Sequence, residues 1–175
     1  NGGTAEQDFT LTVTEVNDVP VANASSFSTN EDNEGSTTLT GNDGDPWSST
    51  VDDQDLTFTI VSGVSNGTLS LNPSTGEVTY DPDDNFNGSD SFTFTVTDDG
   101  TTDGSSDALT STTATVSITV NAVNDVPTLT TVNSQETSEE TDITVDLSGS
   151  DVDIATNGQT LTFMATSSDP SIVAV

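Results

Sequence analysis

The chain contains no basic residue. Its 175 residues include 30 Asp and Glu but no Lys, Arg or His, which gives a formal net charge of −30. Binding to a nucleic-acid backbone requires cationic side chains that neutralise phosphates, so a nucleic-acid partner is excluded. Attraction to anionic lipid headgroups is excluded for the same reason, and we expect no direct membrane contact. The lack of His also excludes a Ser-His-Asp catalytic arrangement.

Several kinds of bond and catalyst are also missing. Without Cys and His the chain cannot form disulfides or the usual zinc and copper sites. Without Lys it can form neither a Schiff base nor a Lys–Asn isopeptide cross-link. A glycosidase that uses two carboxylates is formally possible. However, the sequence gives no sign of a carboxylate buried against aromatic side chains, since the chain has one Trp and one Tyr. We therefore do not expect an enzyme.

A five-residue motif, Val-Asn-Asp-Val-Pro, occurs twice, at Val16–Pro20 and at Val123–Pro127. The second copy begins 107 residues after the first (123 minus 16). Each copy follows a run of alternating apolar and hydroxyl residues, Phe9–Val13 and Val116–Val120. Such alternation predicts a strand with one buried face, and the Pro favours a stiff, extended exit from it. The repeat length is that of one whole domain, so the motif is interpreted as a linker between domains.

Residues 18–125 carry the pattern of a complete domain. Seven short strand-like runs follow one another at roughly ten-residue spacing, with turn residues between them. In the run Ser91–Thr97, for example, apolar residues alternate with Ser and Thr. The dipeptide Asn66-Gly67 predicts a tight hairpin. The sequence therefore predicts an all-β fold, built as an antiparallel β-sandwich.

The two ends of the chain carry partial patterns. Residues 1–17 hold a single strand run, which we interpret as the closing strand of a preceding repeat. Residues 126–175 restart the pattern, because the Gly-x-Asp-x-Asp spacing of residues 41–45 recurs at 149–153. We interpret them as the first half of a following repeat. Two alternatives stay open: the polypeptide continues, or the N-terminal strand of one copy completes the half-domain of the next in a linear fibre.

The acidic residues gather in the loops between the strand runs. A folded domain with so many uncompensated carboxylates would repel itself. Hard cations held by oxygen ligands would relieve this repulsion, and Ca²⁺ is the natural candidate. The alternative interpretation is a solvated, salt-tolerant acidic surface without bound ions.

Several short motifs follow one another along the whole chain: Val16-Asn17-Asp18-Val19-Pro20 with its copy at Val123–Pro127, Glu31-Asp32-Asn33 with Gly35, Asp43-Gly44-Asp45, Asn66-Gly67-Thr68-Leu69, Tyr80 to Gly88, and Val96-Thr97-Asp98-Asp99-Gly100. In this order they resemble the cadherin-like tandem repeats of large secreted bacterial adhesins of the RTX type. The resemblance implies end-to-end sandwiches in an extracellular or cell-surface bacterial protein. It also implies neighbouring repeats, of the same or an identical chain, as partners.

The resemblance further implies Ca²⁺ at the joints between repeats. For the first joint it implies ligands from Asn17, Asp18, Asp43, Asp45 and Asp98. For the second joint it implies Glu31 and Asp83 or Asp84 from the complete domain, with Asn124, Asp125, Asp151 and Asp153. Alternate residues of an extended Asp-x-Asp point to the same side, so two carboxylates can hold one ion. The extra acidic cluster at Asp52–Asp55 is a candidate for a separate site.

The implied function is structural: a segment that extends a long adhesin or filament and is made rigid by Ca²⁺. The alternative is a carbohydrate- or protein-binding module within an adhesin. A surface glycan or a host or substratum molecule, bound elsewhere in the parent, is a further candidate partner. A sugar-binding platform needs exposed aromatic side chains, and the single Trp and single Tyr offer few.

Overall fold

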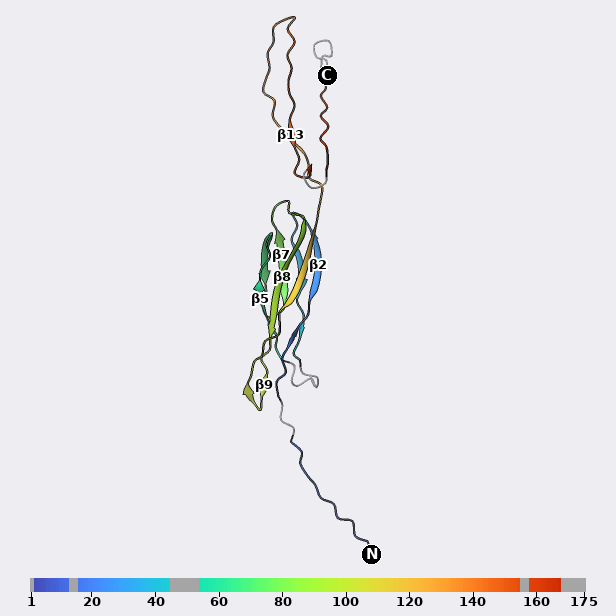
Figure 1. The fold of residues 1–175 in the computed structure, drawn as a ribbon, viewed down its shortest axis with the longest axis vertical. Coiled ribbons are helices and arrows are strands. Elements are labelled where there is room, and N and C mark those ends of the chain that lie inside the picture. Colours follow the sequence, from blue (N-terminus) through green and yellow to red (C-terminus); the bar gives the residue numbers. More distant parts are fainter. Residues whose placement is uncertain (1, 13–15, 45–53, 155–157, 168–175) are drawn as a thin grey trace. The chain divides into compact units, whose positions relative to one another are not determined.

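The computed structural model describes residues 2–12, 16–44, 54–154 and 158–167, and its secondary-structure elements are all strands. The chain divides into two compact units, Asn1–Ala122 and Val123–Val175 (Figure 1). The division lies directly before the second copy of the linker motif. The described part of the chain contains no helix long and apolar enough to cross a membrane.

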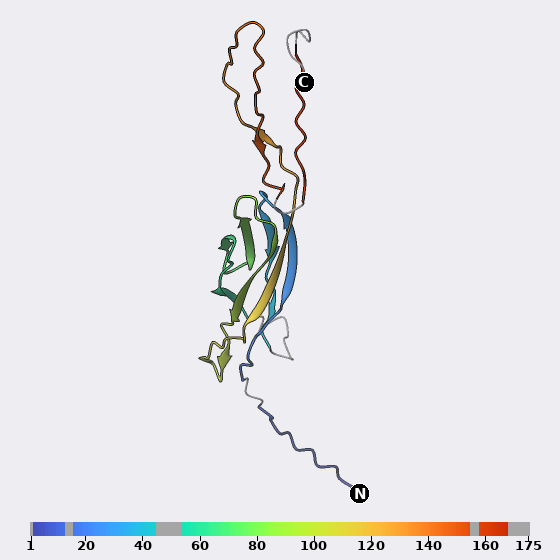
Figure 2. The ribbon, with the colours of Figure 1, turned by 45° about the horizontal axis from the view of Figure 1, so that its top comes forward.

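The larger sheet of the first unit has four strands in the order β2-β11-β8-β5. They span Ser25–Asn30 (β2), Ala114–Asn121 (β11), Gly88–Thr97 (β8) and Thr57–Ser62 (β5). Strand β11 lies between β2 and β8, as Figure 2 shows. It pairs antiparallel with β8 but parallel with β2. This pair departs from the antiparallel pairing predicted for the sandwich, because the first and last long strands run in the same direction.

The smaller sheet of this unit has three antiparallel strands in the order β3-β7-β6. They span Gly35–Thr38 (β3), Glu77–Pro82 (β7) and Gly67–Leu71 (β6). The hairpin predicted at Asn66-Gly67 was wrong, because β5 lies in the larger sheet while β6 pairs with β7. The chain crosses between the sheets at this point. Gly67 is required there, since a Cβ would lie 2.3 Å from the carbonyl oxygen of Asp81.

The core lies between these two sheets and is built from the alternating apolar positions of their strands. In β11 the burial strictly alternates from Ala114 to Asn121. Phe94 and Phe58, from β8 and β5, pack with ring centroids 6.3 Å apart. The described residues of the first unit form seven strands of four or more residues, which confirms the predicted all-β sandwich. Its buried apolar residues are Leu39, Phe58, Val78, Tyr80, Phe92, Phe94, Val96, Ala114, Val116, Ile118 and Val120.

Two short strand pairs flank the end of the first unit at which the linker enters. Strands β1 (Val21–Ala22) and β4 (Gly41–Asn42) pair antiparallel. Strands β9 (Thr101–Thr102) and β10 (Ser105–Ser106) form a hairpin of their own. Both pairs bring loop residues beside the linker.

The segment before the first linker forms no strand in its described residues. Phe9 and Leu11 expose 87% and 77% of their surface. A strand needs a neighbour to accept its hydrogen bonds, and residues 9–12 have none. The assignment of this segment to a preceding repeat stays a prediction.

The second unit repeats the first strand pairing of the first unit. Strand β12 (Thr128–Leu129) pairs with β13 (Gly149–Ser150) in the register Thr128–Ser150 and Leu129–Gly149. The equivalent residues of β1 and β4 pair in the same way in the first unit. Large apolar side chains of this unit remain exposed, including Leu129 (76%) and Met164 (88%).

Candidate metal centre

The linker and the acidic loop after β4 meet because β1 and β4 pair antiparallel. Continuing the register Val21–Asn42 brings Asp43 and Gly44 alongside Pro20 and Val19. Gly44 has a φ of +91°, and a Cβ there would lie 2.5 Å from the carbonyl oxygen of Val19. A glycine is therefore needed for the loop to lie against the linker. Asp43, which precedes it, is buried.

Asp98 lies at the same end of the domain, directly after β8, and is only 4% exposed. Its Oδ1 accepts hydrogen bonds from Asn17 Nδ2 (3.0 Å), Gly100 N (3.2 Å) and Leu109 N (2.8 Å). Its Oδ2 is buried and has no hydrogen-bond partner among the residues that the structure describes. Burying a carboxylate oxygen without a donor is unfavourable, and a bound cation would remove this penalty.

Asn17 is buried in the same network. Its backbone N–H donates to Thr102 Oγ1 (3.1 Å), and its Nδ2 donates to the Asp107 carbonyl (2.7 Å) as well as to Asp98. Its Oδ1 accepts a hydrogen bond from Gln54 Nε2 (3.0 Å). All the polar atoms of its carboxamide are thus engaged. The carboxamide packs closely against Gly100, because a Cβ at position 100 would lie 2.2 to 2.4 Å from the carboxamide atoms.

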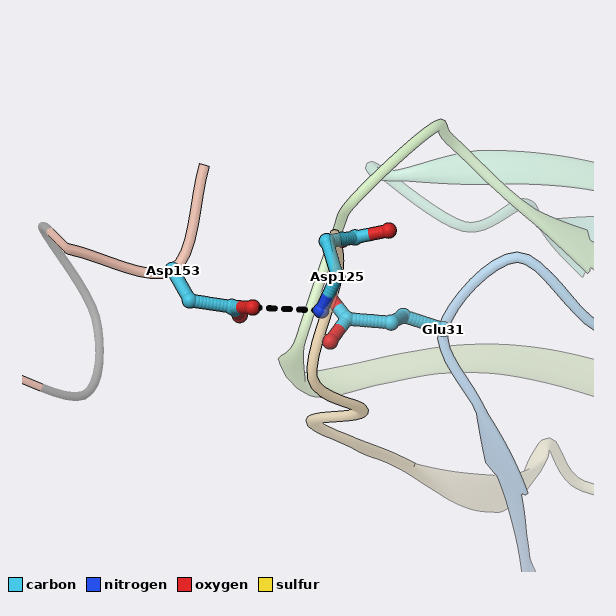
Figure 3. Close-up of side chains that lie close together, drawn as sticks. All are labelled: Glu31, Asp125 and Asp153. Carbon is cyan, nitrogen blue, oxygen red and sulfur yellow. Dashed lines mark hydrogen bonds between the residues drawn. The ribbon is translucent and has the colours of Figure 1, made fainter. Parts of the chain in front are cut away.

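Glu31 follows β2 at the opposite end of the larger sheet and is 2% exposed (Figure 3). Its backbone N–H donates to the carbonyl of Asn121, and its Oε2 accepts from Asn87 Nδ2 at 3.1 Å. Asp83 and Asp84, which the resemblance placed here, are exposed side chains of the neighbouring loop. One polar contact of the Glu31 carboxylate is therefore the amide of Asn87.

Three acidic residues of the second unit, Asp125, Asp151 and Asp153, form one hydrogen-bonded chain. The backbone N–H of Asp125 donates to Asp153 Oδ2 at 2.6 Å, the bond drawn in Figure 3. The backbone N–H of Asp153 donates in turn to Asp151 Oδ1 at 2.9 Å. Asn124 Nδ2 donates to the carbonyl of Asp125 (2.7 Å), and Gln159 Nε2 donates to Asn124 Oδ1 (2.8 Å). These backbone bonds orient the carboxylates of Asp151 and Asp153 without neutralising them.

The structure thus brings some of the expected ligands into direct contact. Asn17 contacts Asp98, and the four residues from the second linker and its acidic loop form one chain. Asp45 and the Asp52–Asp53 part of the extra cluster lie outside the described residues. The sequence interpretation did not include five contributors: Gln54, Asn87, Thr102, Asp107 and Gln159. One signal was present, because Gln54 and Gln159 each stand two residues before a Leu-Thr-Phe sequence.

Comparison with protein families decides what kind of domain this is. The sequence model of the bacterial cadherin-like domain matches residues 17–122, more than half of the chain. The chain belongs to the bacterial cadherin-like domain family. Such domains are typically non-enzymatic structural or adhesion modules, occur in extracellular or surface proteins, and commonly bind Ca²⁺. No curated protein sequence matches the chain.

Among solved structures, the cadherin-like chain is similar to a nucleoside hydrolase-related hypothetical protein from Saccharophagus degradans that is associated with carbohydrate metabolism. The TM-score is 0.38 and the sequence identity 16%. The match covers 61% of this chain but only 26% of that one, so this chain spans about a quarter of its length. A likeness at this level carries no inference about activity.

Asp90 in β8 is a further carboxylate of the cadherin-like domain. It binds the segment between β5 and β6, where the chain crosses from one sheet to the other. It accepts hydrogen bonds from the backbone N–H groups of Ser65 (3.1 Å), Asn66 (2.8 Å) and Ser91 (2.8 Å). Burial raises the pKa of Asp90, but these hydrogen bonds together outweigh it and hold the pKa below its ordinary 3.8. Tyr80 OH donates to the Asn66 carbonyl at 2.7 Å. Burial and the charge of Asp90 raise the pKa of Tyr80 to about 12.

Proposed function

We propose that the chain is a structural extender segment of a long extracellular adhesin or filament, and that Ca²⁺ bound at the ends of its repeats makes it rigid. The observation that carries the proposal is the buried Oδ2 of Asp98, which has no hydrogen-bond donor among the described residues. The sequence contains no Lys, Arg or His, so no side-chain cation can serve as its partner. A cation from solution fits this position.

The surrounding groups suit Ca²⁺ rather than a softer metal. Asp43 is buried beside the linker, and Asp18 precedes the linker residues that pack against Gly44. Carboxylate and carbonyl oxygens are the ligands that Ca²⁺ prefers, and it accepts six to eight of them in flexible geometry. The chain offers no thiolate or imidazole that would favour zinc or copper. Asp98, Asp18 and Asp43 are therefore the proposed ligands at the end where the linker enters.

The proposal extends to the second linker. The chain of Asp125, Asp151 and Asp153 supplies oxygen ligands of the same kind in the second unit. Glu31 is the buried carboxylate at the exit end of the first unit. Ca²⁺ held by such groups would order consecutive repeats, whether these belong to one polypeptide or to identical chains.

The ion is tested by thermal unfolding of the wild type, Asp98→Asn and a control, Asp81→Asn, each in Ca²⁺ and in EDTA. Asp81 is an exposed carboxylate of β7, so the control removes the same charge. An ion that binds only the folded state stabilises it by about 2.7 kcal/mol at a hundredfold excess over its dissociation constant. We expect Ca²⁺ to raise the melting temperature of the wild type and of Asp81→Asn, and to raise that of Asp98→Asn less. Identical wild-type melting curves in Ca²⁺ and EDTA would refute the proposal.

The extender role is tested separately by small-angle X-ray scattering. Carboxylates without a counter-ion repel one another, so the linkers should flex in EDTA and the maximum dimension should change when Ca²⁺ is added. A maximum dimension that does not respond to Ca²⁺ would argue against rigidification. The alternative role, sugar binding, finds no support from the single Tyr, because Tyr80 is fully buried.

A further inference from the structure

The same side-chain hydrogen bond occurs in both units. Gln54 Nε2 donates to Asn17 Oδ1 at 3.0 Å, and Gln159 Nε2 donates to Asn124 Oδ1 at 2.8 Å. Each Asn is the second residue of a linker motif, and each Gln stands two residues before Leu-Thr-Phe. The separations along the chain differ, at 37 and 35 residues. The contact therefore recurs although the loop between the partners has changed length.

The remaining contacts of Asn17 give this bond a role. Its Nδ2 donates to Asp98 and to the Asp107 carbonyl, and its backbone N–H donates to Thr102. Its carboxamide lies where a Cβ at position 100 would be, so it packs against Gly100. The glutamine donates to the carboxamide oxygen, the acceptor atom of this side chain. In the first unit the glutamine bond thus completes a set of contacts that hold both polar atoms of the carboxamide within one unit. In both units the residue that follows the Asn is an Asp.

We propose that the linker asparagine anchors the linker to its unit, and that the glutamine is the positioning residue that holds it. The Asn and the Asp of the linker motif then have different roles. Asn17 and Asn124 fix the linker to the unit that follows, and Asp18 and Asp125 present the carboxylates. The anchor uses only bonds within one unit and no ion. Only the last step, the presentation of carboxylates, rests on the proposed Ca²⁺ function.

The anchor is tested in EDTA, where Ca²⁺ plays no part. The chain has no Cys, so a single introduced Cys carries a unique nitroxide label. Suitable positions are Val19→Cys and Val126→Cys, since these side chains are 54% and 85% exposed. The label at 19 is combined with Gln54→Leu and the label at 126 with Gln159→Leu. Electron paramagnetic resonance then reports the local mobility of each linker.

A matched control is Gln135→Leu, because Gln135 donates only to the nearby Asn133 carbonyl in the same unit. We expect restricted spectra for the wild type and for Gln135→Leu, and more mobile spectra for Gln54→Leu and Gln159→Leu. Spectra of Gln54→Leu and Gln159→Leu that match the wild type would overturn the anchor. If Gln54→Leu does not fold, Gln54→Glu keeps the side-chain length, removes the amide donor and is judged by the same criterion.

A Ca²⁺ titration by calorimetry then tests whether Gln54 positions the linker or is itself a ligand. Losing one hydrogen bond of about 0.5 to 1.5 kcal/mol would weaken Ca²⁺ binding roughly two- to thirteenfold in Gln54→Leu, with the stoichiometry unchanged. Loss of a binding equivalent in Gln54→Leu would overturn the assignment of Gln54 as a positioning residue. If the wild type binds no Ca²⁺, the proposed function fails, while the measurements in EDTA still decide the anchor.

Discussion

Replacing Asp90 by Asn should destabilise the domain by loosening the crossing between its two sheets. The carboxylate accepts three backbone N–H groups, and a hydrogen bond to a charged group contributes about 1.5 to 3 kcal/mol where it is buried. The bonds from Ser65 and Ser91 are exposed, so water replaces much of their contribution, and only the bond from Asn66 is partly buried. We therefore expect a loss of about 1 to 3 kcal/mol rather than the sum of three buried bonds.

The assay for Asp90→Asn is urea unfolding at neutral pH in EDTA, with Asp81→Asn as the control for the lost charge. The reasoning also predicts a pH dependence. The pKa of Asp90 is lower in the folded state than its ordinary 3.8, so its stabilisation is present above that value and disappears as the pH falls through the folded-state pKa. The wild type and Asp90→Asn should therefore converge in acid. A loss within about 0.5 kcal/mol of the control at neutral pH would refute the argument.

Three further outcomes follow from single residues. Tyr80 is the one Tyr, and its pKa, measured by ultraviolet absorbance, should be near 12. Because the pKa is higher in the folded than in the unfolded state, the folding stability should fall as the pH rises from 10 to 12. A titration midpoint near 10 in the folded protein would contradict this. Gly100→Ala should lower the melting temperature by displacing the linker carboxamide, whereas Gly63→Ala, with open space around its Cβ, should not; equal effects would exclude the steric cause. Phe94→Ala should cost about 3 to 5 kcal/mol in urea unfolding and the exposed Phe9→Ala almost nothing, and a small loss for Phe94→Ala would mean that the core is not packed as described.

The strands of the sandwich could be predicted from sequence because each has one buried face. In Ala114–Asn121 and Ser91–Thr97 the alternation of apolar and hydroxyl residues is the burial pattern itself. Which strands pair was harder to predict. Asn66-Gly67 has the composition of a hairpin turn, but turn composition does not reveal whether the next strand stays in the same sheet. The parallel pairing of β2 with β11 depends on contacts between residues about 90 positions apart.

The site could be predicted only in part. Asn17 and Asp98 stand in motifs, and the structure joins them. Gln54 and Gln159 carry no charge and lie in acidic loops, so composition does not mark them. Their role follows from position alone, since each must stand where its amide reaches the linker. Aligning the two repeats around Leu-Thr-Phe would have found the pair.

The parallel ladder between β2 and β11 has a mechanical consequence. The chain enters the domain just before β2 and leaves it just after β11, and six residue pairs from Ser25–Val116 to Asn30–Asn121 connect the two strands. Tension on the two linkers pulls these parallel strands in opposite directions along their length. The load is then shared by the whole ladder in shear, instead of opening one hydrogen bond at a time as in a peeled hairpin. A domain whose linkers adjoin two paired parallel strands therefore resists stretching through its first and last long strands.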